Sequence, residues 1–163
     1  MSQHLSPLEA NALSAFWFYL HAAERFGICS NELHYLHALA LALDDDLTSL
    51  LLLKKLKLAD QFSATSIPRD VAALNSFVEF RTAGGPSQLC QLTHRSAHEG
   101  AGAYALCVDT RLGAGLLGLR AGQSILWPDE EGLLQELHLL RADNRPGIEV
   151  LFTRAWPDGE FRS

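Results

Sequence analysis

Positive charge is scarce in this chain of 163 residues: 13 lysines and arginines stand against 19 aspartates and glutamates, for a net charge of −6. Binding to the phosphate backbone of nucleic acid requires clustered lysine and arginine side chains. The charge balance therefore argues against direct binding of nucleic acid and favours a protein as the partner.

Cysteine is also rare, and its spacing is uninformative for metal or redox chemistry. Cys29, Cys90 and Cys107 cannot all pair within one chain, and no two of them have CxxC spacing. We therefore expect a cytoplasmic protein in which the three thiols are small core residues.

Long apolar runs are absent too. The richest stretch, Leu13 to Ala23, is far shorter than the ~20 apolar residues that a membrane span needs, and no positively charged segment precedes it as in a signal peptide. We expect a soluble protein without membrane contact. Its hydrophobic fraction of 48% is enough for one domain and an appendage.

Three helices are predicted in the N-terminal part, residues 1–66. Ser6 and Pro7 open the first helix, which should run to about Phe26. The apolar periodicity predicts a second helix from Asn31 to Leu43 and a third from Leu47 to Phe62. We expect these two to form an antiparallel hairpin with the acidic residues Asp44, Asp45 and Asp46 at its tip.

The first helix should lie over the free side of this hairpin. Its aromatic residues widen the apolar face beyond what one partner helix covers, and we expect Phe16, Trp17 and Leu20 to be buried there. The alternative is an exposed interaction face that could form a dimer. We favour the monomer, because large exposed apolar patches are uncommon on soluble monomers.

The pattern changes in the C-terminal part, residues 67–163. Alternating polar and apolar residues predict strands, and Leu112 to Gly118 has helical spacing after the capping residues Asp109 and Thr110. The strands are expected at about Ser76–Arg81, Ser87–Thr93, Ala103–Val108, Gln123–Trp127, Leu133–Leu140 and Ile148–Arg154. The predicted class is α+β, a helical hairpin with an extra helix followed by an antiparallel sheet with one short helix.

Two segments of this part carry a family resemblance. Gly113 to Ile125 reads GAGLLGLRAGQSI, and Ile67 to Phe80 reads IPRDVAALNSFVEF. Both resemble the C-terminal domain of the GreA/GreB transcript-cleavage factors, and more closely the Rnk group, the regulators of nucleoside diphosphate kinase. The likeness spans roughly residues 50 to 156.

The resemblance implies an FKBP-like fold and a transcription regulator that docks at the secondary channel of bacterial RNA polymerase and competes with other channel factors. Gre factors read Ser-Pro-Leu-Gly where this chain has Thr110, Arg111, Leu112 and Gly113, and those positions touch the rim of the channel. Leu112 and Gly113 keep the pattern, whereas Arg111 replaces a rigid proline with a cation.

The acidic residues at the predicted hairpin tip match those of the Gre factors in type, but the helices that carry them are much shorter. Gre factors carry acidic residues at the tip of a long coiled coil, where they help to hold a catalytic magnesium ion. A second helix of ~13 residues spans only ~20 Å. We therefore expect Asp44, Asp45 and Asp46 to cap the third helix, with Asp46 accepting from the N–H of Thr48 or Ser49, rather than to support transcript cleavage.

The sequence offers few other candidates for a metal or catalytic site, and we expect neither a cofactor nor a metal. His94, His98 and Glu99 have ligand-like spacing, but Gly100 and Gly102 favour a solvated loop. His34 and His37 share a helix face without a visible third ligand. The enzymatic alternative is a peptidyl-prolyl isomerase, suggested only by the FKBP-like fold; we favour a binding protein that is not an enzyme.

Overall fold

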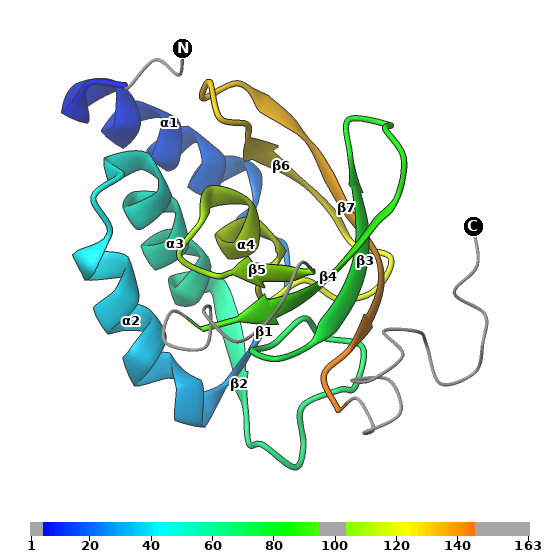
Figure 1. Cartoon of the computed structure of the whole chain (residues 1–163). Coiled ribbons are helices and arrows are strands. Elements are labelled where there is room, and N and C mark those ends of the chain that lie inside the picture. Colours follow the sequence, from blue (N-terminus) through cyan, green and yellow to red (C-terminus); the bar gives the residue numbers. More distant parts are fainter. Residues whose placement is uncertain (1–4, 95–103, 146–163) are drawn as a thin grey trace.

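The computed structural model describes residues 5–94 and 104–145 and confirms the α+β class (Figure 1). The helices are α1 (Pro7–Leu20), the 3-10 turn η1 (Ser30–Glu32), α2 (Leu33–Ala42), α3 (Asp46–Leu58) and α4 (Arg111–Leu116). The strands are β1 (Phe26–Cys29), β2 (Ala59–Phe62), β3 (Phe77–Thr82), β4 (Gln88–Thr93), β5 (Ala105–Cys107), β6 (Ser124–Pro128) and β7 (Leu134–Asp143).

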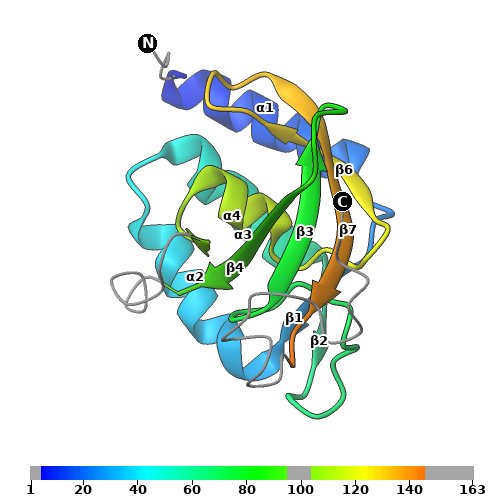
Figure 2. The same cartoon turned by 45° about the vertical axis from the view of Figure 1, so that its right-hand side comes forward.

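The main sheet has five strands in the order β5-β4-β3-β7-β6, and the helices gather on one of its faces (Figure 2). The sheet is mixed rather than wholly antiparallel, because β5 runs parallel to β4. A parallel neighbour requires a long crossover rather than a hairpin turn, and the connection from Thr93 to Ala105 has that length. The predicted strand Ile148–Arg154 lies outside the described residues.

A second, two-stranded sheet was not predicted. β1 and β2 pair in parallel, from Phe26 opposite Ala59 to Cys29 opposite Phe62. The predicted ends of the first and third helices, at Phe26 and Phe62, are therefore wrong. Their apolar residues fit a helical period, but burial of all four residues of β1 favours extended backbone paired across a long sequence separation.

The helical hairpin is confirmed: α2 and α3 pack together and are joined by residues 43–45 (Figure 1). α1 packs on α3, and Trp17 is completely buried as expected. Phe16 and Leu20 were also expected to be buried, and this is wrong, since they are 53% and 44% exposed. At 100° per residue they lie about 100° and 60° around α1 from Trp17, on the flank of the helix toward its exposed face.

Trp17 reaches beyond the hairpin to the edge of the main sheet. Its indole Nε1 donates to the backbone oxygen of Leu126 in β6 at 2.6 Å, and its ring meets that of Trp127 edge-on at 5.5 Å. The backbone N–H of Leu126 donates to Nε2 of His21 at 3.2 Å. Because β6 is an edge strand, α1 thus satisfies backbone groups that would otherwise be open to pairing with another chain.

Glycine allows α4 to pack closely on the sheet. A Cβ atom on Gly115 would lie 2.6 Å from the Trp127 ring, and one on Gly113 would lie 2.1 Å from the Cys107 carbonyl oxygen. Gly118, with φ of +87°, follows the helix in the left-handed conformation that ends many helices. The glycines of the GAGLLG segment are therefore explained by the close packing of α4 on the sheet.

A buried lysine joins the hairpin to α4. Lys55 in α3 is 0% exposed, and its ammonium donates to the carbonyl oxygens of Ala114, Gly115 and Leu117 at 2.7, 2.6 and 2.8 Å. These carbonyls lie at the C-terminal end of α4, where backbone acceptors lack helical partners. Burial lowers the pKa of Lys55 well below its ordinary value, while three acceptors, which only a charged ammonium can satisfy together, favour the protonated form.

The hydrophobic core is continuous across both parts of the chain. Buried residues of the hairpin, such as Leu36 and Leu51, belong to one cluster with Val78, Leu116 and Leu137 of the sheet region. The division between residues 66 and 67 stays a prediction. No helix among the described residues combines the length and apolar character that crossing a membrane requires.

We predict that Lys55→Met lowers the free energy of unfolding by about 3–5 kcal/mol, because methionine fills the space but leaves three buried carbonyls without donors. Lys57→Met, on the exposed side of the same helix, is the control and should cost less than about 1 kcal/mol. Chemical denaturation at neutral pH measures both. Equal stability of Lys55→Met and the wild type would contradict this role for Lys55.

Candidate functional site

The site lies where the first turn of α4 meets the start of α3, beside the end of β6. Thr110 precedes α4 as its N-cap, and its hydroxyl accepts from the backbone N–H of Gly113 at 3.0 Å. The capping predicted for Thr110 is confirmed. The residues expected to form a partner-binding loop, Thr110 to Gly113, are thus the cap and first turn of a helix whose conformation is fixed by local hydrogen bonds.

Arg111 holds this turn against the hairpin. Its guanidinium donates to the carboxylate of Asp45 at 2.6 Å, to the hydroxyl of Thr48 at 3.1 Å and to the backbone oxygen of Asp129 at 2.6 Å. Its own backbone oxygen accepts from Nε1 of Trp127 at 2.7 Å. We call the group of Arg111, Asp45 and Thr48 the clasp.

The electrostatics of the clasp favour an ionised Asp45. Burial raises the pKa of the Asp45 carboxyl, but hydrogen bonds from Thr48 and Arg111 and the charge of Arg111 outweigh it and lower that pKa below its ordinary value. The Arg111 side chain is only 14% exposed and that of Asp45 is 37% exposed. The pair is partly shielded from solvent, so its attraction is screened less than that of a surface ion pair.

The three predicted tip residues therefore have different environments. Asp44 and Asp46 are exposed, whereas Asp45 points into the clasp. The expectation that Asp46 accepts from Thr48 or Ser49 is wrong: Asp45 is the N-cap residue of α3, its carboxylate accepts from the hydroxyl of Thr48, and Asp46 is already within the helix. Sequence spacing did not indicate that the tip and the turn before α4 would meet.

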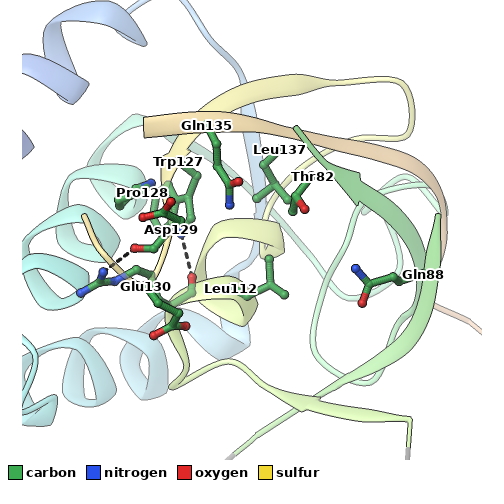
Figure 3. Close-up of a pocket in the computed structure, with 10 residues that line it drawn as sticks. Thr82, Gln88, Leu112, Trp127, Pro128, Asp129, Glu130, Gln135 and Leu137 are labelled. Atoms are coloured by element: carbon green, nitrogen blue, oxygen red, sulfur yellow. Dashed lines mark hydrogen bonds between the residues drawn. The ribbon is translucent and has the colours of Figure 1, made fainter. Parts of the chain in front are cut away.

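An open cavity of about 170 Å³ lies beside the clasp (Figure 3). Its apolar wall is formed by Leu112, Trp127, Pro128 and Leu137. Thr82, Gln88, Arg111, Asp129, Glu130 and Gln135 supply polar groups around it. Figure 3 shows Leu112 pointing from α4 toward the space between β6 and Gln88. Such a cavity suits an apolar side chain of a partner with polar groups at its edge.

The metal-ligand candidates that the structure describes are not grouped together. His34 and His37 are exposed on α2, and His94 meets the ring of Tyr35 edge-on at 6.1 Å. His98 and Glu99 lie outside the described residues. Within residues 5–94 and 104–145, no three histidine, cysteine or acidic side chains are grouped as metal ligands.

The three cysteines are buried as predicted, and the pKa of one thiol is strongly raised. Burial raises the pKa of the Cys90 thiol to about 12. A thiol with such a pKa carries almost no thiolate at neutral pH, which argues against a nucleophilic role for Cys90.

We predict that Asp45→Asn lowers the free energy of unfolding by about 0.5–1 kcal/mol at neutral pH, a modest loss because the Asp45 side chain is 37% exposed and its charge is partly screened by solvent. Since folding lowers the pKa of Asp45 below 3.8, its contribution is present above that pH and lost as the pH falls through the folded-state pKa. The difference from the wild type should therefore shrink in acid. Asp44→Asn, which alters an exposed neighbour, should change little at either pH, and a pH-independent loss for Asp45→Asn would contradict the ion pair.

Comparison with known proteins finds similarity in structure. No family model and no curated protein matches the sequence. The chain is similar to a structure described as prokaryotic transcription elongation factor GreA/GreB from Nitrosomonas europaea, with a TM-score of 0.57, 23% identity, and coverage of 73% of this chain and 98% of that one.

Two Gfh1 structures are more distant. The structure from Thermus aquaticus has a TM-score of 0.38 and 20% identity, over 57% of this chain and 59% of that one. The GreA factor homolog 1 of Thermus thermophilus has a TM-score of 0.37 and 16% identity, over 83% and 94%. The N. europaea similarity, at this level of identity, establishes a shared fold: a helical region followed by a sheet with one short helix.

Proposed function

We propose that this chain is a transcription regulator that binds bacterial RNA polymerase in the cytoplasm, in the manner of the Rnk and Gre factors. The observation that carries the proposal is the shared fold with a structure described as a transcription elongation factor, over 98% of that chain. The resemblance in Gly113 to Ile125, the segment that forms most of α4 and the approach to β6, supports it independently.

Docking would use the turn before α4 and the adjacent cavity. Leu112 is partly exposed and borders the cavity, so it can contact a helix at the rim of the secondary channel. Arg111 would have a different role, because its guanidinium is already bonded to Asp45 and Thr48 within the clasp. It would set the position of the docking turn relative to the hairpin, while Leu112 and Thr110 make the contact.

The same geometry supports occupation of the channel without transcript cleavage. α2 has only 10 residues, which is about 15 Å at 1.5 Å per residue. Asp45 is turned back into the clasp rather than presented beyond the tip. A protein of this shape would compete with longer channel factors and would not itself be an enzyme.

The isomerase alternative has one observation in its favour, the apolar cavity wall that includes Trp127. However, Trp127 is 2% exposed, and its ring is committed to Gly115 and to the backbone of Arg111. Acceleration of proline isomerisation in a model peptide, without any binding of polymerase, would favour the alternative.

We expect Leu112→Asp to weaken binding to core RNA polymerase of the source organism by at least about tenfold, because a charge would be placed in the apolar contact. Leu41→Asp is the matched control, since Leu41 is 73% exposed on α2, away from the turn. Direct titration of labelled protein with polymerase measures both affinities. Unchanged binding of a folded Leu112→Asp variant would exclude this docking turn, and Arg111→Asp with Leu112→Asp should bind no better than the single variant.

Transcript cleavage supplies a separate test. Backtracked elongation complexes incubated with the protein and magnesium should show no more cleavage of the transcript 3′ end than complexes without it, and a long Gre factor added afterwards should cleave less. Cleavage that requires Asp44, Asp45 and Asp46, and disappears when all three are alanine, would show instead that the tip reaches the active centre.

A further inference from the structure

α1 is apolar on the face that it turns to solvent as well as on the face that it buries. Leu8 is 79% exposed, Phe16 is 53% exposed and Tyr19 is 80% exposed. The buried residues Ala10, Ser14 and Trp17 occupy the opposite side of the helix. A helix that is apolar all round normally has neighbours on every side, and here no described element covers the outer one.

The exposed residues form one continuous stripe. At 3.6 residues per turn, positions 8, 12, 15, 16 and 19 fall on one face. We call Leu8, Ala12, Ala15, Phe16 and Tyr19 the α1 stripe. Leu8 and Tyr19 lie at its two ends, the two alanines lie in the middle, and Phe16 lies beside Ala15 at the lateral edge of the stripe, so another helix could approach the centre closely over the alanines.

We propose that the occupant of the α1 stripe is a second copy of this chain, packed with its α1 antiparallel to the first about a two-fold axis. In that arrangement Leu8 of one copy meets Tyr19 of the other, and Ala12 meets Ala15. Large residues then face large ones at the ends while the alanines allow close approach at the centre. A two-fold interface uses the same surface on both copies, and this stripe is complementary to itself.

Charges beside the stripe select the antiparallel direction. α1 and α3 run side by side with their N-terminal ends together, since Pro7 and Asn11 share a shallow cavity with Asp46 and Leu50. At the other end, the ammonium groups of Lys54 and Lys57 lie 5.4 and 5.9 Å from the ring of Phe18.

The acidic and basic ends of α3 are therefore separated along the stripe. A two-fold axis perpendicular to α1 keeps both copies of α3 on the same side of the interface and reverses their direction. Asp46 of each copy then faces Lys54 and Lys57 of the other. Parallel α1 helices would place like charges at the same end and give no such pairing.

The area available indicates a moderate affinity. Phe16 and Tyr19 together offer on the order of 200–300 Å², at about 150–250 Å² for a whole aromatic side chain and exposures of 53% and 80%. Leu8, Leu20 and the alanines add to this, but a stable interface buries about 800 Å² on each partner. We expect reversible dimers in the micromolar range rather than an obligate dimer.

Sedimentation velocity over a concentration series tests the dimer without polymerase, so its failure is distinguishable from failure of the proposed function. The wild type should pass from monomer to dimer as its concentration rises. Tyr19→Glu should weaken the dimer at least about tenfold, whereas Leu41→Glu, a charge at an equally exposed leucine outside the stripe, should not. A wild type that is monomeric at every concentration, or equal weakening by both variants, would overturn the proposal.

A charge reversal tests the direction of packing. Lys54→Glu with Lys57→Glu should weaken the dimer by repulsion from Asp46, and adding Asp46→Lys should recover most of the affinity. Absence of recovery would exclude the antiparallel arrangement. If Tyr19→Glu instead leaves self-association unchanged and abolishes binding to polymerase, the stripe belongs to the polymerase contact and the dimer is wrong.

Discussion

The buried ammonium of Lys55 is the interaction on which the arrangement of the two halves depends. A fully buried charge is tolerated only when every donor is satisfied, and the three acceptors come from one short stretch at the end of α4. The position of α3 is therefore fixed relative to α4, and through α4 to the sheet. The rings of Trp127 and Phe26, at 4.6 and 5.4 Å from the ammonium, complete its surroundings.

The placement of α1 follows from a second set of polar groups, at the edge of the sheet. Leu126 exposes a backbone N–H and a backbone carbonyl on an edge strand, and His21 and Trp17 satisfy them. Because the Leu126 N–H donates to Nε2, the proton of His21 lies on Nδ1, which donates to the Trp17 oxygen at 2.8 Å. These bonds fix the rotation of α1 about its axis. Trp17 must face the sheet, and so Tyr19 must face solvent.

Local signals in the sequence predicted much of this fold, and long-range contacts account for what they missed. Residue types such as the threonine at 110 and the glycine at 118 predict the start and the end of a helix to within a few positions. β1 and β2 were missed because each is stabilised by a strand more than 30 residues away, as in the pairing of Phe26 with Ala59. Lys55 lies four residues after Leu51 on the buried face of α3, so helical spacing could have indicated its burial, but not its acceptors in α4.

The candidate site was predictable in position but not in arrangement. Spacing and resemblance singled out Arg111 and Asp45 separately, and only the folded chain shows that they form one ion pair. Proline suits the first position of a helix because its φ is already helical and its missing N–H is not needed there. Arginine at that position loses this restriction. Here the guanidinium restricts the turn in a different way. Its hydrogen bonds to Asp45, Thr48 and the Asp129 backbone hold the first turn of α4 in place through the arginine side chain. The cation before Leu112 and the acid at the hairpin tip are thus two halves of one feature, an ion pair that holds the first turn of α4 against the start of α3.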